Sequence, residues 1–108
     1  MYRGRLYYES EGNYIDVHQF IIRDEQGAVW LTTTWGAQGK FSIDTQLRRI
    51  GDYYSTGKVR LKNPAGVVQT VETEIEFKVS HEPDDGVYIE GVWRESGIEY
   101  KFEGDLAK

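Results

Sequence analysis

Residues 87–106, VYIEGVWRESGIEYKFEGDL, contain two runs in which apolar and charged side chains alternate, separated by Ser96 and Gly97. Because successive side chains of a β-strand leave opposite faces of the sheet, this alternation predicts two half-buried strands. Ser-Gly suits a two-residue hairpin turn, which places Glu95 opposite Ile98. The segment therefore predicts an antiparallel hairpin whose strand glycines face large partners, with these pairs: Trp93 and Tyr100, Gly91 and Phe102, Ile89 and Gly104, Val87 and Leu106, Arg94 and Glu99, Glu90 and Glu103.

The rest of the chain repeats this pattern. Residues 71–79 place Val, Thr, Ile, Phe and Val on one face, against three glutamates and a lysine on the other. A turn over Asn63–Gly66 would pair Val59 with Val71 and Lys58 with Glu72. Short segments of turn-forming residues separate further runs rich in Tyr, Trp, Val, Ile and Thr. We expect strands near residues 2–9, 14–23, 28–35, 57–63, 67–80, 86–95 and 98–106.

Residues 41–54 fit two structures. As a helix, the segment has Ser42 as a cap, Gly51 as a stop and apolar residues at helical spacing, namely Ile43, Leu47, Ile50 and Tyr54. As a strand, its apolar and polar residues alternate from Phe41 to Leu47. We favour a strand, because it would help to close the sheet, and a short helix near 42–50 is the alternative.

These elements predict one all-β domain over residues 1–108, an antiparallel meander of about eight strands. A meander leaves two unpaired edges unless it curls shut, so we expect a small up-and-down barrel, with a two-sheet β-sandwich as the alternative. Glycines inside strands, at positions 4, 91 and 104, permit sharp bends and favour the barrel.

Composition narrows the possible functions. The chain has no cysteine, which excludes disulfides and thiol chemistry and fits a reducing compartment. Its net charge of −5 makes nucleic acid an unfavourable partner. We find neither an apolar run long enough to span a bilayer nor an apolar secretion signal at the start, so we expect a cytoplasmic location and no membrane partner.

Aromatic residues provide the main candidate site. An eight-stranded barrel either fills with side chains or holds one small ligand, and its mouth is a common place for a pocket. We therefore expect an interior site for a small apolar or aromatic ligand, with no cofactor, lined by Trp30, Trp35, Tyr88, Trp93, Tyr100 and Phe102. The competing interpretation is that these rings simply form the core.

Catalytic and metal-binding signals are weak. Asp16 and His18 fall on one strand face, where the carboxylate could orient the imidazole, but no nucleophile elbow presents Ser10, Ser42 or Ser55. The loop His81–Gly86 groups a histidine with three carboxylates, without the spacing of a calcium loop. The segment Gly36–Lys40 lacks the spacing and hydroxyl of a phosphate loop. We therefore expect no catalytic residues and no metal, and favour binding over catalysis.

The alternative function is a protein-interaction module, such as an inhibitor, an immunity-type factor or an accessory protein. It would act through an exposed sheet face or edge, as a monomer or a homodimer, and tyrosine is enriched in such interfaces. Candidate contacts are Tyr7, Tyr14, Tyr53 and Tyr54. A basic patch that could bind single-stranded nucleic acid is a weaker possibility against the overall acidity, formed by Arg48, Arg49, Lys58, Arg60 and Lys62.

Overall fold

The protein is all-β. A computed structural model describes residues 1–8, 15–36, 41–62 and 70–108, and these residues form ten strands and no helix. The strands are β1 (Tyr2–Tyr8), β2 (Val17–Glu25), β3 (Ala28–Trp35), β4 (Phe41–Gln46), β5 (Arg48–Ile50), β6 (Tyr53–Ser55), β7 (Val59–Lys62), β8 (Thr70–His81), β9 (Val87–Glu95) and β10 (Ile98–Ala107).

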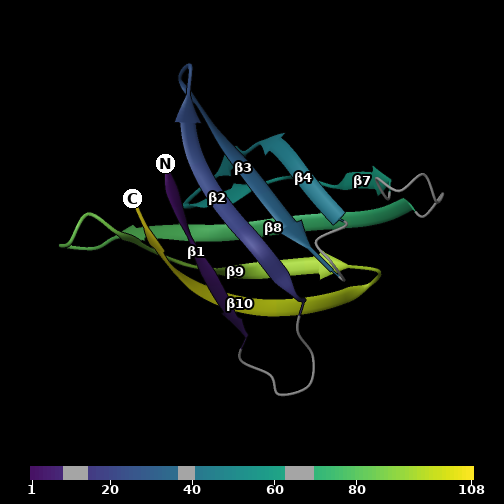
Figure 1. The fold of residues 1–108 in the computed structure, drawn as a ribbon. Coiled ribbons are helices and arrows are strands. Elements are labelled where there is room, and N and C mark those ends of the chain that lie inside the picture. The colour runs from purple at the N-terminus through teal and green to yellow at the C-terminus, as the bar shows by residue number, and fades with distance from the viewer. Residues whose placement is uncertain (9–14, 37–40, 63–69) are drawn as a thin grey trace.

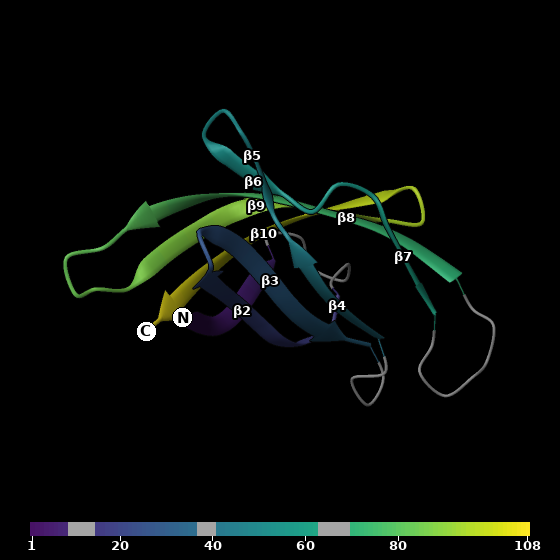
Figure 2. The same cartoon turned by 90° about the horizontal axis from the view of Figure 1, so that it is seen from above.

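All ten strands belong to one antiparallel sheet. Its order is β4-β3-β2-β1-β10-β9-β8-β6-β5, and β7 also pairs with β8. The first strand therefore lies between β2 and β10, and the two chain ends lie near each other (Figure 1). Strands β2–β4 cross over the layer formed by β8–β10 (Figure 2), so the sheet wraps around a common interior. The result is the predicted barrel, nearly closed.

The two ends of the strand order meet through one residue. Strand β4 pairs with β3, β5 pairs with β6, and only Leu47 separates β4 from β5. The Leu47 N–H donates to the Val29 carbonyl at 2.8 Å, which extends the β3 pairing to this point. The segment 41–50 is thus one bent strand that changes partner, and it closes the sheet where sequence alone left helix and strand open.

A second bent strand follows. Strands β6 and β7 both lie along β8, and the Thr56 N–H between them donates to the Ile75 carbonyl at 2.9 Å. If β4 and β5 are counted as one bent strand, and β6 and β7 as another, the ten strands become eight, which agrees with the predicted number of about eight. Among the described residues, β4 approaches β7 without pairing to it, so the barrel wall has an unpaired seam there.

Alternating apolar side chains fill the interior. Phe20 meets Phe77 edge to face, with ring centroids 5.6 Å apart, and lies 6.0 Å from Phe102. All three rings are at most 2 % exposed. They come from β2, β8 and β10, so the packing joins opposite walls of the barrel.

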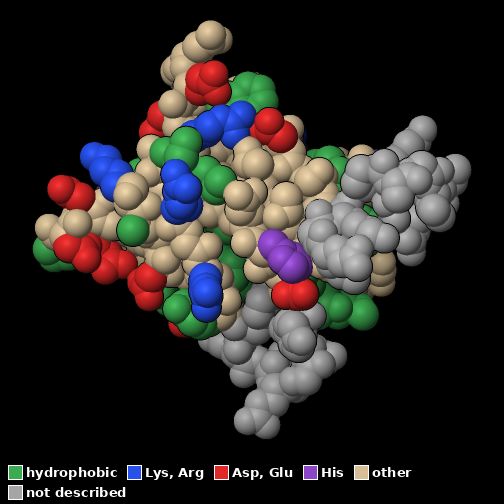
Figure 3. All heavy atoms as spheres, viewed as in Figure 1, with side chains coloured by type: hydrophobic (Ala, Val, Ile, Leu, Met, Phe, Trp, Pro, Cys, Tyr) green, Lys and Arg blue, Asp and Glu red, His purple; other side chains and the backbone are tan. Residues whose placement is uncertain are grey.

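Charged side chains cover much of the outer surface (Figure 3). On the face formed by β1–β3, basic side chains lie over the strands, and acidic side chains gather at the end that carries the β8–β9 turn (Figure 3). Strand alternation accounts for the outward direction of these charged side chains.

The β9–β10 register is confirmed at every predicted pair, including Gly91 with Phe102 and Arg94 with Glu99. Its turn residues have positive φ angles of 52° at Ser96 and 78° at Gly97, as the tight hairpin requires. Gly91 is also needed for packing, because a Cβ there would lie 2.1 Å from the Glu76 carbonyl oxygen.

The strand favoured for the segment from Phe41 is confirmed, and its alternative, a short helix near 42–50, is absent because these residues form β4 and β5. One expectation needs correction. The predicted β7–β8 register is wrong by two residues: Val59 pairs with Thr73, and Val71 pairs with Leu61. A shift of two keeps every side chain on its face, so alternation cannot detect it. The Asn63–Gly66 turn lies outside the described residues.

Candidate functional site

The barrel places only part of the predicted aromatic site inside. Trp35, Trp93 and Phe102 are at most 3 % exposed, and Tyr100 packs against the same core. Trp30 and Tyr88 alternate with buried neighbours, Leu31 and Ile89, and therefore point outwards. Trp30 and Trp93 thus lie on opposite faces of the barrel wall and border no common cavity.

Trp30 belongs to an outer polar network centred on Arg23. The Arg23 guanidinium lies 5.6 Å from the centre of the Trp30 ring and 2.9 Å from an Asp44 oxygen. It also donates to Glu25, at 3.2 Å, and to Thr32. Hydrogen bonds to Asp44 and then Glu25 raise the pKa of Arg23. This arrangement stabilises the surface of β2–β4 and explains Trp30 without a ligand.

Tyr88 has a similar place on β9. Partial burial, followed by a hydrogen bond to the Glu103 carboxylate, raises the pKa of its phenol. The phenol is therefore a neutral hydrogen-bond donor on the outer face.

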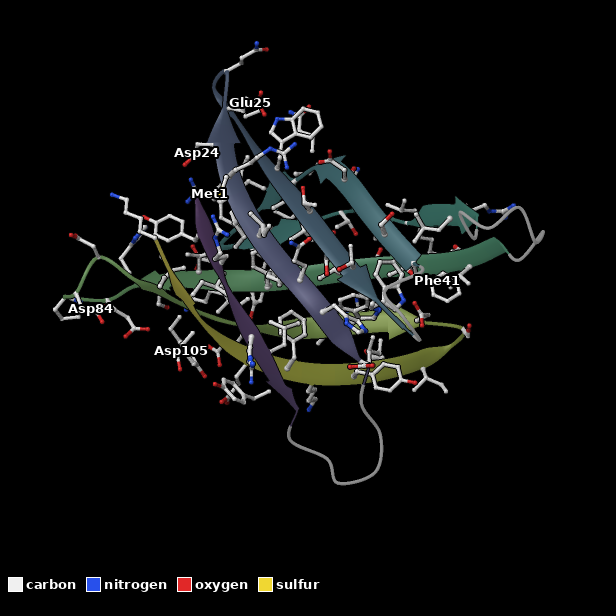
Figure 4. All side chains as sticks on the ribbon, viewed as in Figure 1. Met1, Asp24, Glu25, Phe41, Asp84 and Asp105 are labelled. Carbon is white, nitrogen blue, oxygen red and sulfur yellow. The ribbon has the colours of Figure 1, made fainter. Side chains whose placement is uncertain are left out.

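Four rings gather at one end of the barrel, which we call the aromatic end: Trp35, Phe41, Trp93 and Tyr100. Trp35 meets Trp93 edge to face at 5.0 Å and stacks on Phe41 at 5.9 Å with an interplanar angle of 22°. Tyr100 pairs directly with Trp93 across β9 and β10. Figure 4 shows Phe41 at the start of β4, near the end of β3. This end also contains the unpaired seam between β4 and β7.

The aromatic end contains an unsatisfied donor. Trp93 is fully buried, and its Nε1–H has no hydrogen-bond partner among the residues that the structure describes. A buried donor without an acceptor costs about 1–3 kcal/mol. Most buried polar groups in proteins are satisfied, so this atom requires an explanation.

A carboxylate lies beside it on the same strand. Glu95 follows Trp93 by two residues, hence on the same face, and is opposite Thr73 on β8. Thr73 is 1 % exposed, and its hydroxyl donates to a Glu95 oxygen at 2.9 Å. Sequence reasoning missed Phe41, Thr73 and Glu95 as site residues, although the alternation in β9 already put Glu95 on the face of Trp93.

The hollows on the described surface include the following three, and neither Trp93 nor Trp30 is among the residues that line them. The first, of about 270 Å³, lies beside the β9–β10 turn and includes Arg94 and Glu95. The second, of about 370 Å³, lies over Glu90 and Glu103. The third, of about 440 Å³, lies between the β5–β6 hairpin and the last residues of β8.

The predicted Asp16–His18 pair forms, but on the surface. An Asp16 oxygen lies 3.3 Å from His18 Nε2, with the side chains 64 % and 43 % exposed. The same nitrogen is 2.8 Å from the Gly36 carbonyl oxygen. Of the predicted serines, Ser42 is on β4, separated from β2 by β3, and Ser55 is buried and accepts a hydrogen bond from the Gly57 N–H. Ser10 lies outside the described residues.

The second histidine is far from the first. His81 ends β8, whereas His18 lies near the start of β2, at the opposite end of the barrel. Among the described residues, no group of three or more His, Asp or Glu side chains is arranged to hold a metal ion. The residues considered for catalysis, the Asp16–His18 pair and His81, therefore do not lie together in one site.

The predicted basic residues are spread over several strands. Lys58 lies 3.6 Å from a Glu72 oxygen, and Arg60 pairs with Glu72 across β7 and β8. Arg48 and Arg49 lie on β5. Two of the predicted basic residues, Lys58 and Arg60, thus lie beside an acidic side chain.

Comparison with protein-family models, with curated proteins and with solved structures finds no match to this chain. The described residues include no helix of the length and apolar character needed to cross a membrane.

Proposed function

We propose that the barrel is a non-enzymatic binding protein for a small, mostly apolar or aromatic molecule that carries a hydrogen-bond acceptor. The ligand would occupy the aromatic end. The observation that carries this proposal is the buried Trp93 Nε1–H, which lacks an acceptor among the described residues.

An acceptor on the ligand would offset the cost of this buried donor, and the surrounding rings would contribute apolar contact. Carbonyl and ether oxygens meet the requirement.

Access would be through the seam at Phe41. This side chain is only partly buried, and it begins β4 where β4 and β7 are not paired. The Phe41 ring stacks on Trp35, so a ligand ring that displaced it would gain the same aromatic contact. Strand hydrogen bonds elsewhere in the described wall make other routes costlier.

Acetophenone and ethylbenzene provide a direct test, because they are close in size and differ in the carbonyl oxygen. The indole N–H signals of the protein would be followed by ¹H–¹⁵N NMR during titration with each compound. We expect acetophenone to shift the Trp93 signal and to bind about tenfold more tightly than ethylbenzene, the effect of one net hydrogen bond.

Trp93→Phe keeps an aromatic ring and removes the donor, so it should abolish the preference for acetophenone. Trp30→Phe, on the outer face, is the matched control and should leave the preference unchanged. Equal binding of both compounds to the native protein, or no shift of the Trp93 signal in the millimolar range, would refute the proposal.

The alternative is a protein-interaction module that pairs its β5 edge with an extended strand of a partner protein. Ile50 and Tyr53 favour it, because they lie directly opposite each other and are 55 % and 41 % exposed. Replacing both with serine should weaken self-association or partner binding in sedimentation experiments. A cytoplasmic location remains part of either proposal, and the absence of cysteine supports it.

A further inference from the structure

Glu95 breaks the alternation that builds the barrel. On β9, which the structure describes in full, the inner-face positions are, in chain order, Val87, Ile89, Gly91, Trp93 and Glu95. The cross-strand neighbours of Glu95 on β8 and β10 are Thr73 and Ile98, both uncharged. A carboxylate at a position where the pattern calls for an apolar side chain is a local inconsistency, and such inconsistencies are expected at functional sites.

The Glu95 carboxylate is held on the side of the aromatic end. Thr73 is buried and lies on the same face of β8 as Ile75, and its hydroxyl donates to Glu95 Oε1 at 2.9 Å. Glu95 is half-buried and follows Trp93 by two residues, about 7 Å along the strand. Strand β9 ends on the side of the barrel at which β4 begins with Phe41 (Figure 1). The carboxylate therefore lies at the rim of the aromatic end.

Glu95 differs from the glutamates of the outer face, which have basic partners. Arg94 lies 2.6 Å from Glu74, and Lys58 lies 3.6 Å from Glu72. Both cations line the hollow beside the β9–β10 turn together with Glu95. Among the residues that the structure describes, however, Glu95 forms no ion pair, and its Oε2 accepts no hydrogen bond. A cation supplied by a ligand can therefore pair with this oxygen.

We propose that Glu95 determines the specificity of the aromatic end and selects an aromatic ligand that carries a protonated amine beside its hydrogen-bond acceptor. This inference rests on the proposed function and names the class of ligand. The acceptor would meet the Trp93 Nε1–H inside the barrel, and the amine would donate to Glu95 Oε2 at the rim. Such a charge-assisted hydrogen bond is about twice as strong as a neutral one. Thr73 is then a positioning residue, because it orients the carboxylate.

The test compares α-dimethylaminoacetophenone with isovalerophenone. The two ketones have nearly the same shape and differ in that a protonated nitrogen replaces a CH group. The full chain would be titrated with each compound at low ionic strength and slightly below neutral pH, where the amine is protonated, and the indole N–H signals would be followed by ¹H–¹⁵N NMR. We expect both ketones to shift the Trp93 signal and the amine to bind about tenfold more tightly or better.

Glu95→Gln keeps an acceptor for the Thr73 hydroxyl and removes the charge, so it should abolish the preference for the amine and leave the affinity for isovalerophenone unchanged. Glu99→Gln is the matched control. It removes one negative charge from the same hairpin on the outer face, opposite Arg94, and should preserve the preference. The NMR spectra verify that each variant is folded.

The outcomes separate this inference from the proposed function. If isovalerophenone shifts the Trp93 signal but the amine binds no more tightly, the proposed function stands and the role of Glu95 is refuted. An equal loss of preference in Glu95→Gln and Glu99→Gln would also refute it, because the effect would then come from net charge. If neither ketone shifts the Trp93 signal, both proposals fail.

Discussion

Trp35 and Trp93 meet edge to face with ring centroids 5.0 Å apart, although their strands, β3 and β9, are not neighbours in the sheet. The contact therefore crosses the interior and joins opposite walls of the barrel. It also positions the unpartnered Trp93 Nε1–H at the aromatic end.

Trp35→Ala should destabilise the protein by about 3–5 kcal/mol, because it removes a large buried ring and leaves a cavity. Trp30→Ala is the matched control. Trp30 contacts Arg23 on the outer face, so its loss should cost about 1 kcal/mol or less. Urea denaturation of both variants measures the difference, and equal losses would contradict the interior role of Trp35.

Gly91→Ala should destabilise the protein by about 3 kcal/mol, the upper part of the range for overpacked sites. The added methyl group would collide with backbone atoms of Glu76 and Phe77, and a backbone cannot rotate away. Val92→Ala, on the opposite face of β9, should cost far less. Thermal unfolding tests both variants, and a stable Gly91→Ala protein would show that β8 and β9 can separate.

Arg94→Gln should lower stability by about 1 kcal/mol at low ionic strength. Arg94 lies 2.6 Å from Glu74, 3.3 Å from Glu99 and 3.8 Å from Glu76, so its removal leaves repelling carboxylates. Partial burial lowers the pKa of Arg94, but the hydrogen bonds to Glu74 and Glu99 outweigh this effect, so the pKa is raised. Because salt screens exposed charges, the loss should shrink in about 1 M NaCl. Lys101→Gln is the control, and a salt-independent loss would point to packing instead.

Glu82→Gln should remove a pH dependence of stability. Partial burial, the hydrogen bond to Asp105 and the charges of Asp105 and Asp84 raise the pKa of Glu82 in the folded protein. Asp84 and Asp105 lie at the same end of the barrel (Figure 4). The folded state therefore holds the Glu82 proton more tightly than the unfolded state does.

Protonated Glu82 therefore stabilises the folded protein fully below the ordinary glutamate pKa of about 4.3. This stabilisation is lost as the pH rises through the raised pKa that Glu82 has in the folded state. Urea midpoints measured between pH 4 and pH 7 should fall less in Glu82→Gln than in the native protein. Asp85→Asn, in the same turn, serves as the control. Identical pH profiles for the native protein and Glu82→Gln would exclude this role.

The β9–β10 hairpin shows that local sequence signals can predict a strand register. A two-residue turn, two glycines that need large partners and one favourable charge pair all agree on a single register, and that register is the one observed. For β7 and β8, alternation and charge are compatible with two registers that differ by two residues, and they do not identify the observed one. Local signals are sufficient only where a turn and its side chains constrain the same pairing.

The candidate site was predicted less well for a related reason. Residue type alone places Trp30 and Tyr88 with the interior rings, although alternation with Leu31 and Ile89 puts both on the outer face. Phe41 was recognised as an apolar residue of a strand, but its stacking on Trp35 depends on how β3 meets β4 at the mouth.

Amphipathic alternation was enough to predict an antiparallel all-β domain with a charged exterior, because each strand must bury its apolar face. The choice of a barrel over a two-sheet sandwich was decided by the tertiary structure. The partner change at Leu47, the unpaired seam beside Phe41 and the unsatisfied Trp93 donor all required the folded chain. Each depends on which distant strands come together around the barrel, and side chains separated by half the sequence leave no periodic trace of that meeting.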